Sequence, residues 1–355
     1  MKSPGRAIAG ADSAPGMVTR LSCAEQTVWH GYNPITMKAI RVHSFGDPEV
    51  LQLEEVPTPD VGSGQVLIRV KAAGVNPVET YIRKGIYGPM TFPFTPGNES
   101  AGIVEAIGEN VDHLRIGERV YSSKTITGSY AQFTLCDAGN VHPLPERATF
   151  QQGAAIGVAG GTAYRGLFQR GRGKAGEMVL VHGATGGVGT SAVQLARAAG
   201  MVVVGTSSSE KGRTFALQQG ANLAVDHDIT SRPDEVKSLT DGRGFDLILE
   251  FAAHQNLASD MKSVARGGRI VVIGSRGDIQ ITPRDAMAKE SDILGLMLFG
   301  ASPAEHREMY SALTAALESG TFRPVIGLEL PLAEAVKAHH LVIEGDQFGK
   351  IVLIP

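Results

Sequence analysis

The feature of this sequence that most restricts its fold is a glycine-rich turn between an apolar run and a helical pattern. The turn reads Gly183-Ala-Thr-Gly-Gly-Val-Gly189; it follows the run 178–182 and leads into residues 188–199. Glycine permits positive φ and lets a ligand approach the backbone. The helix start presents unpaired N–H groups and the positive end of its dipole, which stabilise phosphate. The turn therefore predicts a dinucleotide site, although tight strand-to-helix turns without a ligand also use glycine.

The residues after this turn alternate between strand and helix patterns. Strands are expected at 178–182, 201–205, 223–226, 246–251, 269–273 and 293–298, with helices between them, for example at 188–199, 211–219 and 257–265. This alternation is typical of a parallel sheet covered by helices. Beyond residue 298 we expect a helix near 305–317, a strand near 325–330, a helix near 332–343 and a strand at 350–354. These last pieces could extend the parallel sheet or return to an earlier domain.

Residues 37 to about 150 show a different pattern, with short β-rich runs separated by Gly, Pro and Asn. The runs 38–42, 65–70, 102–106 and 118–121 predict a compact, mostly antiparallel β domain. A length of 355 residues exceeds what one core usually serves, so two domains are expected. The predicted fold class is therefore α/β, a doubly wound parallel sheet accompanied by a mostly antiparallel β domain.

Composition and charge argue against several function classes. A formal net charge of -3 leaves no basic surplus to attract nucleic acid or an anionic membrane. Two cysteines, Cys23 and Cys136, are too few for a disulfide framework or a four-thiolate zinc site, and they favour a reducing compartment. Cys136 is expected to be a buried strand residue. No apolar run is long enough to span a bilayer, so we expect a cytoplasmic protein without membrane contacts.

Residues 1–36 differ from the rest of the chain because they are rich in Gly, Ala, Ser and Pro and show no clear period. We expect a disordered extension there. Arg6 and Arg20 also allow an organelle-targeting leader, which would place the protein in mitochondria. Asp12 and Glu25 and the lack of an amphipathic pattern count against a leader.

The end of the second strand of the parallel sheet distinguishes NAD from NADP, because an acidic residue there would repel a 2′-phosphate. Here the segment 205–213 reads GTSSSEKGR, so serines replace the acid and Lys211 and Arg213 follow. Ser208 and these two cations can bind a phosphate, which favours NADPH. Alternatively, Ser209 only caps the next helix, and the cations form its solvated face. Glu210 is the feature that counts against NADPH.

A later strand ends with Ile273-Gly274-Ser275-Arg276, at the same edge of the predicted sheet. Open α/β sheets bind their ligands at this edge. We therefore expect a contact with the nicotinamide side of the cofactor, with a simple turn as the alternative.

Four stretches make the prediction more specific. Residues 74–81, 96–102, 181–189 and 273–277 read GVNPVETY, PGNESAG, VHGATGGVG and IGSRG. Together they resemble the medium-chain dehydrogenases/reductases, and within them the zinc-free, zeta-crystallin-like NADPH quinone oxidoreductases. The resemblance extends from Met37 to Pro355 and includes residues 281–291. It implies a GroES-like catalytic domain of residues 37–151 and 299–355 and an NADP-binding Rossmann domain of residues 152–298.

The zinc-binding branch of that family has a Cys and a His at two positions where this chain has Asn76 and Asn98. Neutral amides are poor zinc ligands beside thiolate and imidazole. Glu99 is retained from the same motif, but one carboxylate does not make a metal site. We therefore expect no metal.

The resemblance also implies the residues that act on the substrate. Without zinc, the protein must position the nicotinamide and stabilise charge on the acceptor. Tyr81 would do so through its phenol and Asn76 through its amide, with Thr162 nearby. The alternatives are a packing role for Tyr81 and a turn role for Asn76, which precedes Pro77.

The cofactor-binding residues transferred from the family follow the ends of successive strands. Ser208 departs from the glycine expected at its position, so its contact could be displaced, and His227 could lie near the adenosine. The implied set is Tyr81, Thr185, Gly186, Gly187, Val188, Ser208, Lys211, Arg213, His227, Asn256, Ile273, Gly274, Ser275, Arg276, Leu296, Met297 and Leu298.

The resemblance implies NADPH-dependent reduction of quinones, with ortho-quinones favoured. Reduction of alkenals, enones or 2-enoyl thioesters remains an alternative. A homodimer or homotetramer is expected from the family. Binding of AU-rich RNA or a crystallin-like structural role is the alternative from another class, but the chain has no RNA-recognition motif and no basic aromatic patch.

Overall fold

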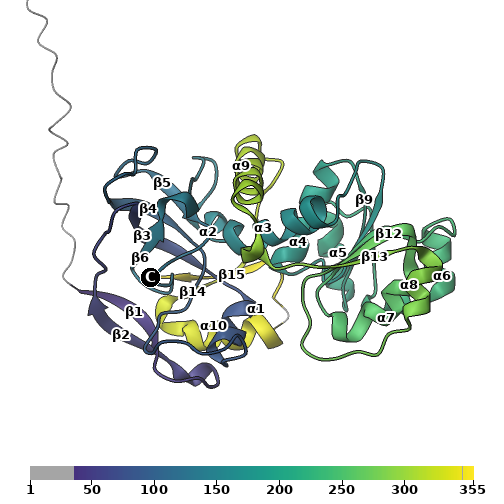
Figure 1. The fold of residues 1–355 in the computed structure, drawn as a ribbon, viewed down its shortest axis with the longest axis horizontal. Helices are drawn as coiled ribbons and strands as arrows, with labels where there is room; N and C mark the ends of the chain where they lie inside the picture. The colour runs from purple at the N-terminus through teal and green to yellow at the C-terminus, as the bar shows by residue number, and fades with distance from the viewer. Residues whose placement is uncertain (1–35, 346) are drawn as a thin grey trace, which may run out of the picture. The chain divides into compact units, whose positions relative to one another are not determined.

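A computed structural model describes residues 36–345 and 347–355, which belong to one compact unit. Its strands form a two-stranded, a six-stranded and a seven-stranded sheet (Figure 1). The predictions for residues 1–35 lie outside the described residues, and Thr36, expected in the extension, already begins the first strand. Within the described ranges, no helix combines the length and apolarity needed to cross a membrane.

The seven-stranded sheet contains the first part of the chain and its last two strands. Its order is β14-β15-β3-β4-β5-β7, and β6 also pairs with β3. Neighbouring strands are antiparallel except β14 and β15, which are parallel. The bounds are β3 (Gln65–Val75), β4 (Ser100–Ile107), β5 (Arg119–Ser122), β6 (Phe133–Asp137), β7 (Val141–Pro143), β14 (Ile326–Pro331) and β15 (Lys350–Ile354). The C-terminal strands thus return to the first sheet.

The small sheet pairs β1 (Thr36–Val42) with β2 (Leu51–Pro57) in antiparallel register. The six-stranded sheet is parallel throughout, with the order β10-β9-β8-β11-β12-β13. Its bounds are β8 (Met178–Val181), β9 (Val202–Thr206), β10 (Leu223–Val225), β11 (Phe245–Glu250), β12 (Val264–Val272) and β13 (Asp292–Gly295).

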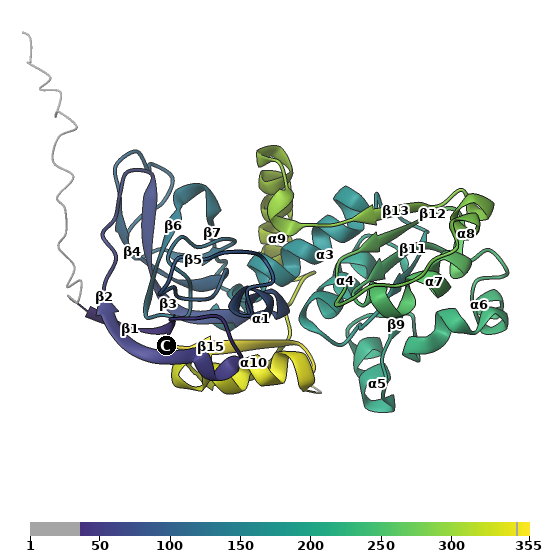
Figure 2. The ribbon, with the colours of Figure 1, turned by 60° about the horizontal axis from the view of Figure 1, so that its bottom comes forward.

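Ten α-helices lie in the described ranges, and several are short. They are α1 (Pro77–Arg83), α2 (Phe150–Gly153), α3 (Gly161–Tyr164), α4 (Gly187–Ala198), α5 (Glu210–Gln218), α6 (Pro233–Leu239), α7 (Ala253–Ser263), α8 (Pro283–Lys289), α9 (Pro303–Ser319) and α10 (Ala335–Glu344). Figure 2 shows α10 alongside β15, which it contacts.

Both faces of the parallel sheet are covered, because successive strand residues point to opposite faces. Val179 and Val181 of β8 pack in one core cluster with Ala192 and Val193 of α4. Leu180, between them, packs in another cluster with residues of α6 and α7. The first cluster also contains residues of the seven-stranded sheet, so one continuous core joins the two sheets.

Candidate functional site

The glycine-rich turn joins β8 to α4, and its shape depends on two glycines. Gly183 has φ of +56°, a backbone conformation that L side chains rarely adopt. A Cβ on Gly189 would lie 2.1 Å from the carbonyl oxygen of Gly183, so only glycine allows this close approach. The helix begins at Gly187 with Gly186 as its N-cap. Its first N–H groups are therefore available to an anion at the turn.

A cavity of about 240 Å³ opens beside this turn. Its lining residues come from the turn, from Phe251 after β11, and from α1, α10 and β15. Among its described lining residues, Lys350 is the one with an ionisable side chain. The lining includes Val75, Asn76, Pro77, Ala159, Gly183, Gly186, Gly187, Val188, Gly189, Leu341, Val342, Gly349 and Ile351.

The segment before β15 closes one end of this cavity by contacting the turn directly. The Gly349 N–H donates to the Thr185 carbonyl at 2.7 Å, and Gly349 forms a parallel bridge with Gly186. The strand that returns to the seven-stranded sheet thereby passes over the turn of the parallel sheet. The next residue, Lys350, is carried to the cavity wall.

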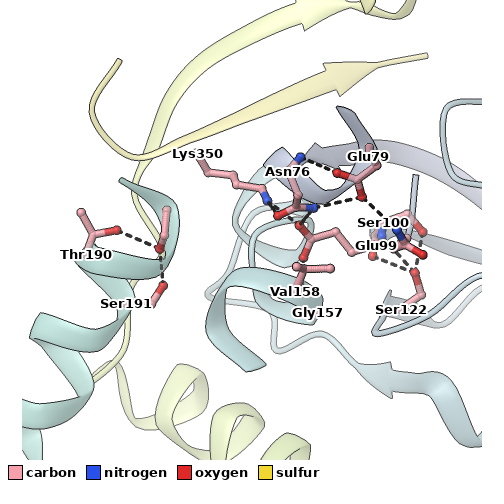
Figure 3. Close-up of polar contacts among 12 residues, drawn as sticks. Asn76, Glu79, Glu99, Ser100, Ser122, Gly157, Val158, Thr190, Ser191 and Lys350 are labelled. Atoms are coloured by element: carbon pink, nitrogen blue, oxygen red, sulfur yellow. Dashed lines mark hydrogen bonds and ion pairs between the residues drawn. The ribbon is translucent and has the colours of Figure 1, made fainter. Parts of the chain in front are cut away.

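A buried polar cluster lies at the wall of this cavity (Figure 3). The Lys350 ammonium is 2.6 Å from Glu99 Oε1 and also donates to Asn76 Oδ1. Asn76 Nδ2 donates to Glu99 Oε1 at 2.9 Å and more distantly to Glu79 Oε1 at 3.3 Å. Asn98 Nδ2 donates to Glu79 Oε1 at 3.1 Å. We call Asn76, Glu79, Asn98, Glu99 and Lys350 the Lys350 cluster.

Local structure fixes two members of this cluster. Asn76 is the N-cap of α1, Pro77 fits the first turn, and Glu79 completes a capping box by accepting the Asn76 backbone N–H at 2.7 Å. Glu99 also accepts the Val158 N–H at 2.6 Å. Gly74 of β3 leaves room for this carboxylate, because a Cβ there would lie 2.4 Å from Glu99 Oε1.

The charges in the Lys350 cluster balance. Burial raises the pKa of Glu79 to about 7; the neighbouring Glu99 adds to this, whereas Lys350 acts in the opposite direction. With Glu79 protonated, the Lys350 ammonium balances the Glu99 carboxylate. The cluster then has no net charge, which suits its burial.

Tyr81 lies one turn along α1 from Asn76 and meets Arg276 from the loop after β12. The Arg276 Nε donates to the Tyr81 hydroxyl at 3.1 Å. Both line a second cavity, of about 760 Å³, whose wall combines apolar and charged residues. Its lining includes Asp47, Glu49, Arg83, Ile86, Tyr87, Gly274, Ser275, His340, Ile343 and Glu344. Two residues predicted from distant parts of the sequence are thus in contact.

Thr162 is buried in α3 and is not among the lining residues of either cavity.

The residues expected near a 2′-phosphate lie at the end of β9 and the start of α5. Ser208 and Lys211 are exposed, and the Lys211 ammonium lies 5.6 Å from the ring centre of Phe348. Arg213 Nη1 donates to Asp226 in an ion pair, so this nitrogen already has an anionic partner. Ser209 caps α5 by accepting the Gly212 N–H at 3.0 Å, so the capping alternative holds for this residue. His227 lies after β10 and contacts the Thr206 hydroxyl at 2.7 Å.

The other expected cofactor residues follow β11, β12 and β13. Asn256 of α7 donates to Glu250 at 3.4 Å. Ile273 and Gly274, just beyond β12, line the larger cavity together with Ser275 and Arg276. They also line a neighbouring hollow of about 380 Å³ that includes Leu296 and Met297, whereas Leu298 packs on the main core.

A buried acid–base group that sequence reasoning missed lies beneath the same sheet edge. His182 Nε2, at the end of β8, is 3.0 Å from Asp260 Oδ1 and 3.3 Å from Glu250 Oε2. Burial raises the pKa of Glu250 to about 7 and that of Asp260 to about 6, and it lowers the pKa of His182. Among the described residues, these three are the group whose ligand atoms lie close enough together to share a metal ion. Protons shared between the two carboxyl groups and the imidazole also explain why their side chains lie so close together.

The sequence contained a usable signal for one missed member of the Lys350 cluster. Asn76-Pro-Val-Glu79 has the spacing of a capping box, which predicts that Glu79 faces its own helix start. Lys350 has no such signal. It reaches Asn76 only because the C-terminal strand pairs with β3.

The comparisons with known proteins cover nearly all of the described chain. Residues 62–146 match the family described as an alcohol dehydrogenase GroES-like domain, and residues 187–318 match the one described as a zinc-binding dehydrogenase. Quinone oxidoreductase of Rattus norvegicus is 46% identical over 321 residues, covering 90% of this chain and 98% of the rat protein. Two structures solved with NADPH are also similar. One is Escherichia coli quinone oxidoreductase, with a TM-score of 0.82, 28% identity and coverage of 90% and 100%. The other is a mycobacterial protein, with a TM-score of 0.84, 30% identity and the same coverage.

Proposed function

Because the chain belongs to the quinone oxidoreductases of the medium-chain dehydrogenase/reductase superfamily, we propose that it reduces quinones, preferably ortho-quinones, with NADPH and without zinc. The family predicted from the four motifs is confirmed, as is the combination of a GroES-like part with a Rossmann-like parallel sheet. The protein is an oxidoreductase, and NADPH is its cofactor. The domain boundaries at 151/152 and 298/299 stay predictions.

The glycine turn beside the Lys350 cluster is the observation that carries this proposal. Gly189 lets the start of α4 pack closely on Gly183, because a Cβ there would lie 2.1 Å from the Gly183 carbonyl oxygen. The N–H groups at Gly187 and Val188, which begin the helix, would then meet the pyrophosphate. Ser208 and Lys211 would meet the 2′-phosphate, since both are exposed where β9 ends. When bound, NADPH supplies the hydride. The chain then has to hold the acceptor against it and stabilise the charge that the acceptor gains.

Tyr81 and Arg276 would orient the acceptor. Their side chains are in contact at 3.1 Å and line the 760 Å³ cavity, which has the size of a small-molecule site. A phenol hydroxyl can donate to a quinone oxygen, and the guanidinium beside it favours negative charge there. Thr162 lies away from this cavity, so its predicted role has less support.

The hydrogen-bond donors in the Lys350 cluster support the proposed zinc independence. Asn76 and Asn98 direct their N–H groups at Glu79 and Glu99, and Lys350 adds an ammonium. A divalent cation at this place would meet N–H donors and a positive charge instead of free lone pairs. The arrangement therefore suits a metal-free site.

The proposal is tested with the full chain by following NADPH oxidation with an ortho-quinone, with and without a chelator. We expect turnover with NADPH, much weaker turnover with NADH, and no effect of the chelator. Equal use of NADH contradicts the role of Ser208 and Lys211, and loss of activity with a chelator contradicts zinc independence. An enone and an enoyl-CoA as acceptors test the alternative activities, since faster turnover with either would replace the quinone.

Self-association, RNA binding and the cytoplasmic location stay predictions. RNA binding would have to be steeply salt-dependent and displaced by NADPH, because the net charge of -3 offers no general attraction for a phosphate backbone. Sedimentation at several protein concentrations tests the homo-oligomer.

A further inference from the structure

Lys350 combines burial, full charge pairing and a place at the cavity wall. It is the first residue of β15 and 4% exposed, yet it lines the 240 Å³ cavity beside the glycine turn. Figure 3 shows its side chain running from the strand towards Asn76 and Glu99, away from the helix that carries Thr190 and Ser191. Its charge is therefore directed at the seven-stranded side of the cavity, where Asn76 begins α1.

The partners of Lys350 leave its ammonium one donor to spare. An ammonium has three N–H groups, and Asn76 Oδ1 and Glu99 Oε1 account for two of them. Glu99 is held in place as well, because it also accepts from Asn76 Nδ2 and the Val158 N–H. These bonds hold the ammonium in place before any ligand arrives, so no reorganisation is needed at the moment of reaction.

Reduction of a quinone creates negative charge that this ammonium can stabilise. The quinone accepts a hydride, one proton with two electrons, as the C–H bond of the dihydronicotinamide breaks. The product is a hydroquinone monoanion and the oxidised cofactor. One proton from water then gives the neutral hydroquinone. Negative charge is therefore greatest on an acceptor oxygen just after hydride transfer. The cavity of Tyr81 and the cavity of Lys350 are both lined by residues of α1 and α10, so an acceptor held by Tyr81 would direct one oxygen towards Lys350.

We propose that Lys350 is a further catalytic residue, whose ammonium donates a hydrogen bond to the acceptor oxygen and stabilises its negative charge. The hydrogen bond transfers no proton, since the proton that completes the hydroquinone comes from water. Glu99 and Asn76 position it, and Asn76 acts mainly through Lys350, because its own amide N–H groups are directed at Glu99 and Glu79. This inference rests on the proposed quinone reduction.

The first test compares Lys350→Met and Lys350→Arg with the parent protein. We expect Lys350→Met to lower kcat about 100-fold, the effect of removing one donor to a developing oxyanion. The Kd for NADPH should change much less than kcat, because the ammonium is paired with Asn76 and Glu99 and not with a residue of the glycine turn. Lys350→Arg should restore part of kcat. The control is Lys337→Met on α10, where the lysine is exposed and pairs only locally with Glu334.

A second variant separates catalysis from charge balance. Lys350→Met leaves Glu99 buried without its partner and could unfold the protein, whereas Lys350→Met/Glu99→Gln removes both charges together. If Lys350 only neutralises Glu99, the double variant regains both thermal stability and kcat, and our inference is wrong. If Lys350 acts on the acceptor, the double variant is stable but its kcat stays low.

A binding readout tests the charge contact without turnover. 4-Nitrocatechol resembles the hydroquinone product, and its absorbance reports ionisation of its hydroxyl. With the NADP⁺-loaded protein, we expect the pKa of the bound hydroxyl to fall, and this shift should be absent in Lys350→Met and in the double variant. A shift that survives in both variants overturns the inference.

Failure of the parent protein to reduce quinones contradicts the proposed function instead, and the nitrocatechol result still decides whether Lys350 meets an oxyanion. A raised Kd for NADPH in Lys350→Met with unchanged kcat assigns Lys350 to the cofactor.

Discussion

The side chain and the backbone N–H of Asn76 make four hydrogen bonds, and these limit what the side chain can do. Its backbone N–H and amide N–H groups donate to Glu79 and Glu99, and its Oδ1 accepts from Lys350. Rotation of the amide would place its nitrogen against the ammonium. The direct donation to substrate that the family resemblance implies would therefore break bonds inside the cluster, which is why we give that role to Lys350.

Lys211 allows the cofactor preference to be tested at a single residue. Lys211→Ala should raise the Kd for NADPH about tenfold, or about 1.4 kcal/mol, because an exposed cation near the 2′-phosphate is lost. The Kd for NADH should not change. Titration of cofactor fluorescence measures both values, and Lys237→Ala on α6, whose ammonium lies 3.6 Å from Asp234, is the control. Equal weakening of both cofactors would show that Lys211 only supports the fold.

Local patterns predicted the longer elements well. The expected strand 350–354 coincides with β15, and the expected helices 188–199 and 211–219 differ from α4 and α5 by one residue at each end. The predicted burial of Cys136 in a strand is also confirmed. The short helices α6 and α8 were not specified, since seven residues give too little periodicity to distinguish a helix from a loop.

At Gly189 of the strand-to-helix turn, we expect replacement of glycine by alanine to destabilise the protein, although this replacement usually stabilises a helix. Alanine normally stabilises a helix relative to glycine by roughly 0.5–1 kcal/mol. Gly189→Ala should instead lower the free energy of unfolding by about 1–3 kcal/mol and weaken NADPH binding, because its Cβ would lie 2.1 Å from the Gly183 carbonyl oxygen.

Urea unfolding and NADPH titration measure the two effects at Gly189. Gly139→Ala is the matched control, because a Cβ there has no described atom within 4 Å. A Gly189→Ala protein that is more stable than the parent would contradict the close approach at the turn.

At the scale of the whole molecule, one core joins the two sheets. The main cluster contains Ala72 of β3, Val179 of β8 and Val352 of β15, from three distant parts of the chain. The sequence allows the C-terminal strands either to extend the parallel sheet or to return to the earlier domain. In the structure β15 pairs with β3 and β14 pairs with β15, and the pairing of β15 with β3 carries Lys350 to Glu99.

Stability of the whole chain should depend on pH through Glu250. Its folded pKa of about 7 lies above the ordinary 4.5, so the unfolded chain loses this proton first as pH rises. The free energy of unfolding therefore falls between about pH 4.5 and 7 on account of this group. The Glu250→Gln variant lacks this titrating group. The difference in free energy of unfolding, variant minus parent, should therefore rise by up to about 3 kcal/mol across this pH range and stay constant above it.

Urea unfolding at several pH values measures the difference for Glu250→Gln. Glu146→Gln is the control, since it makes the same substitution at a side chain that is 90% exposed. A flat difference for Glu250→Gln would show that Glu250 is ionised in the folded protein, and the group with His182 and Asp260 would then need another source of positive charge.

The sequence alone determined the two kinds of sheet, the glycine turn and the absence of thiolate and imidazole at positions 76 and 98, because strand periodicity, turn chemistry and ligand type are local properties. Tertiary structure decided what replaces those ligands. Lys350, Glu99 and Glu79 have no local pattern that links them, and only the pairing of β15 with β3 buries them against Asn76. Buried charges are stable only when they are paired, so the Lys350 ammonium is held by Glu99 and Asn76 at a fixed place in the cavity wall.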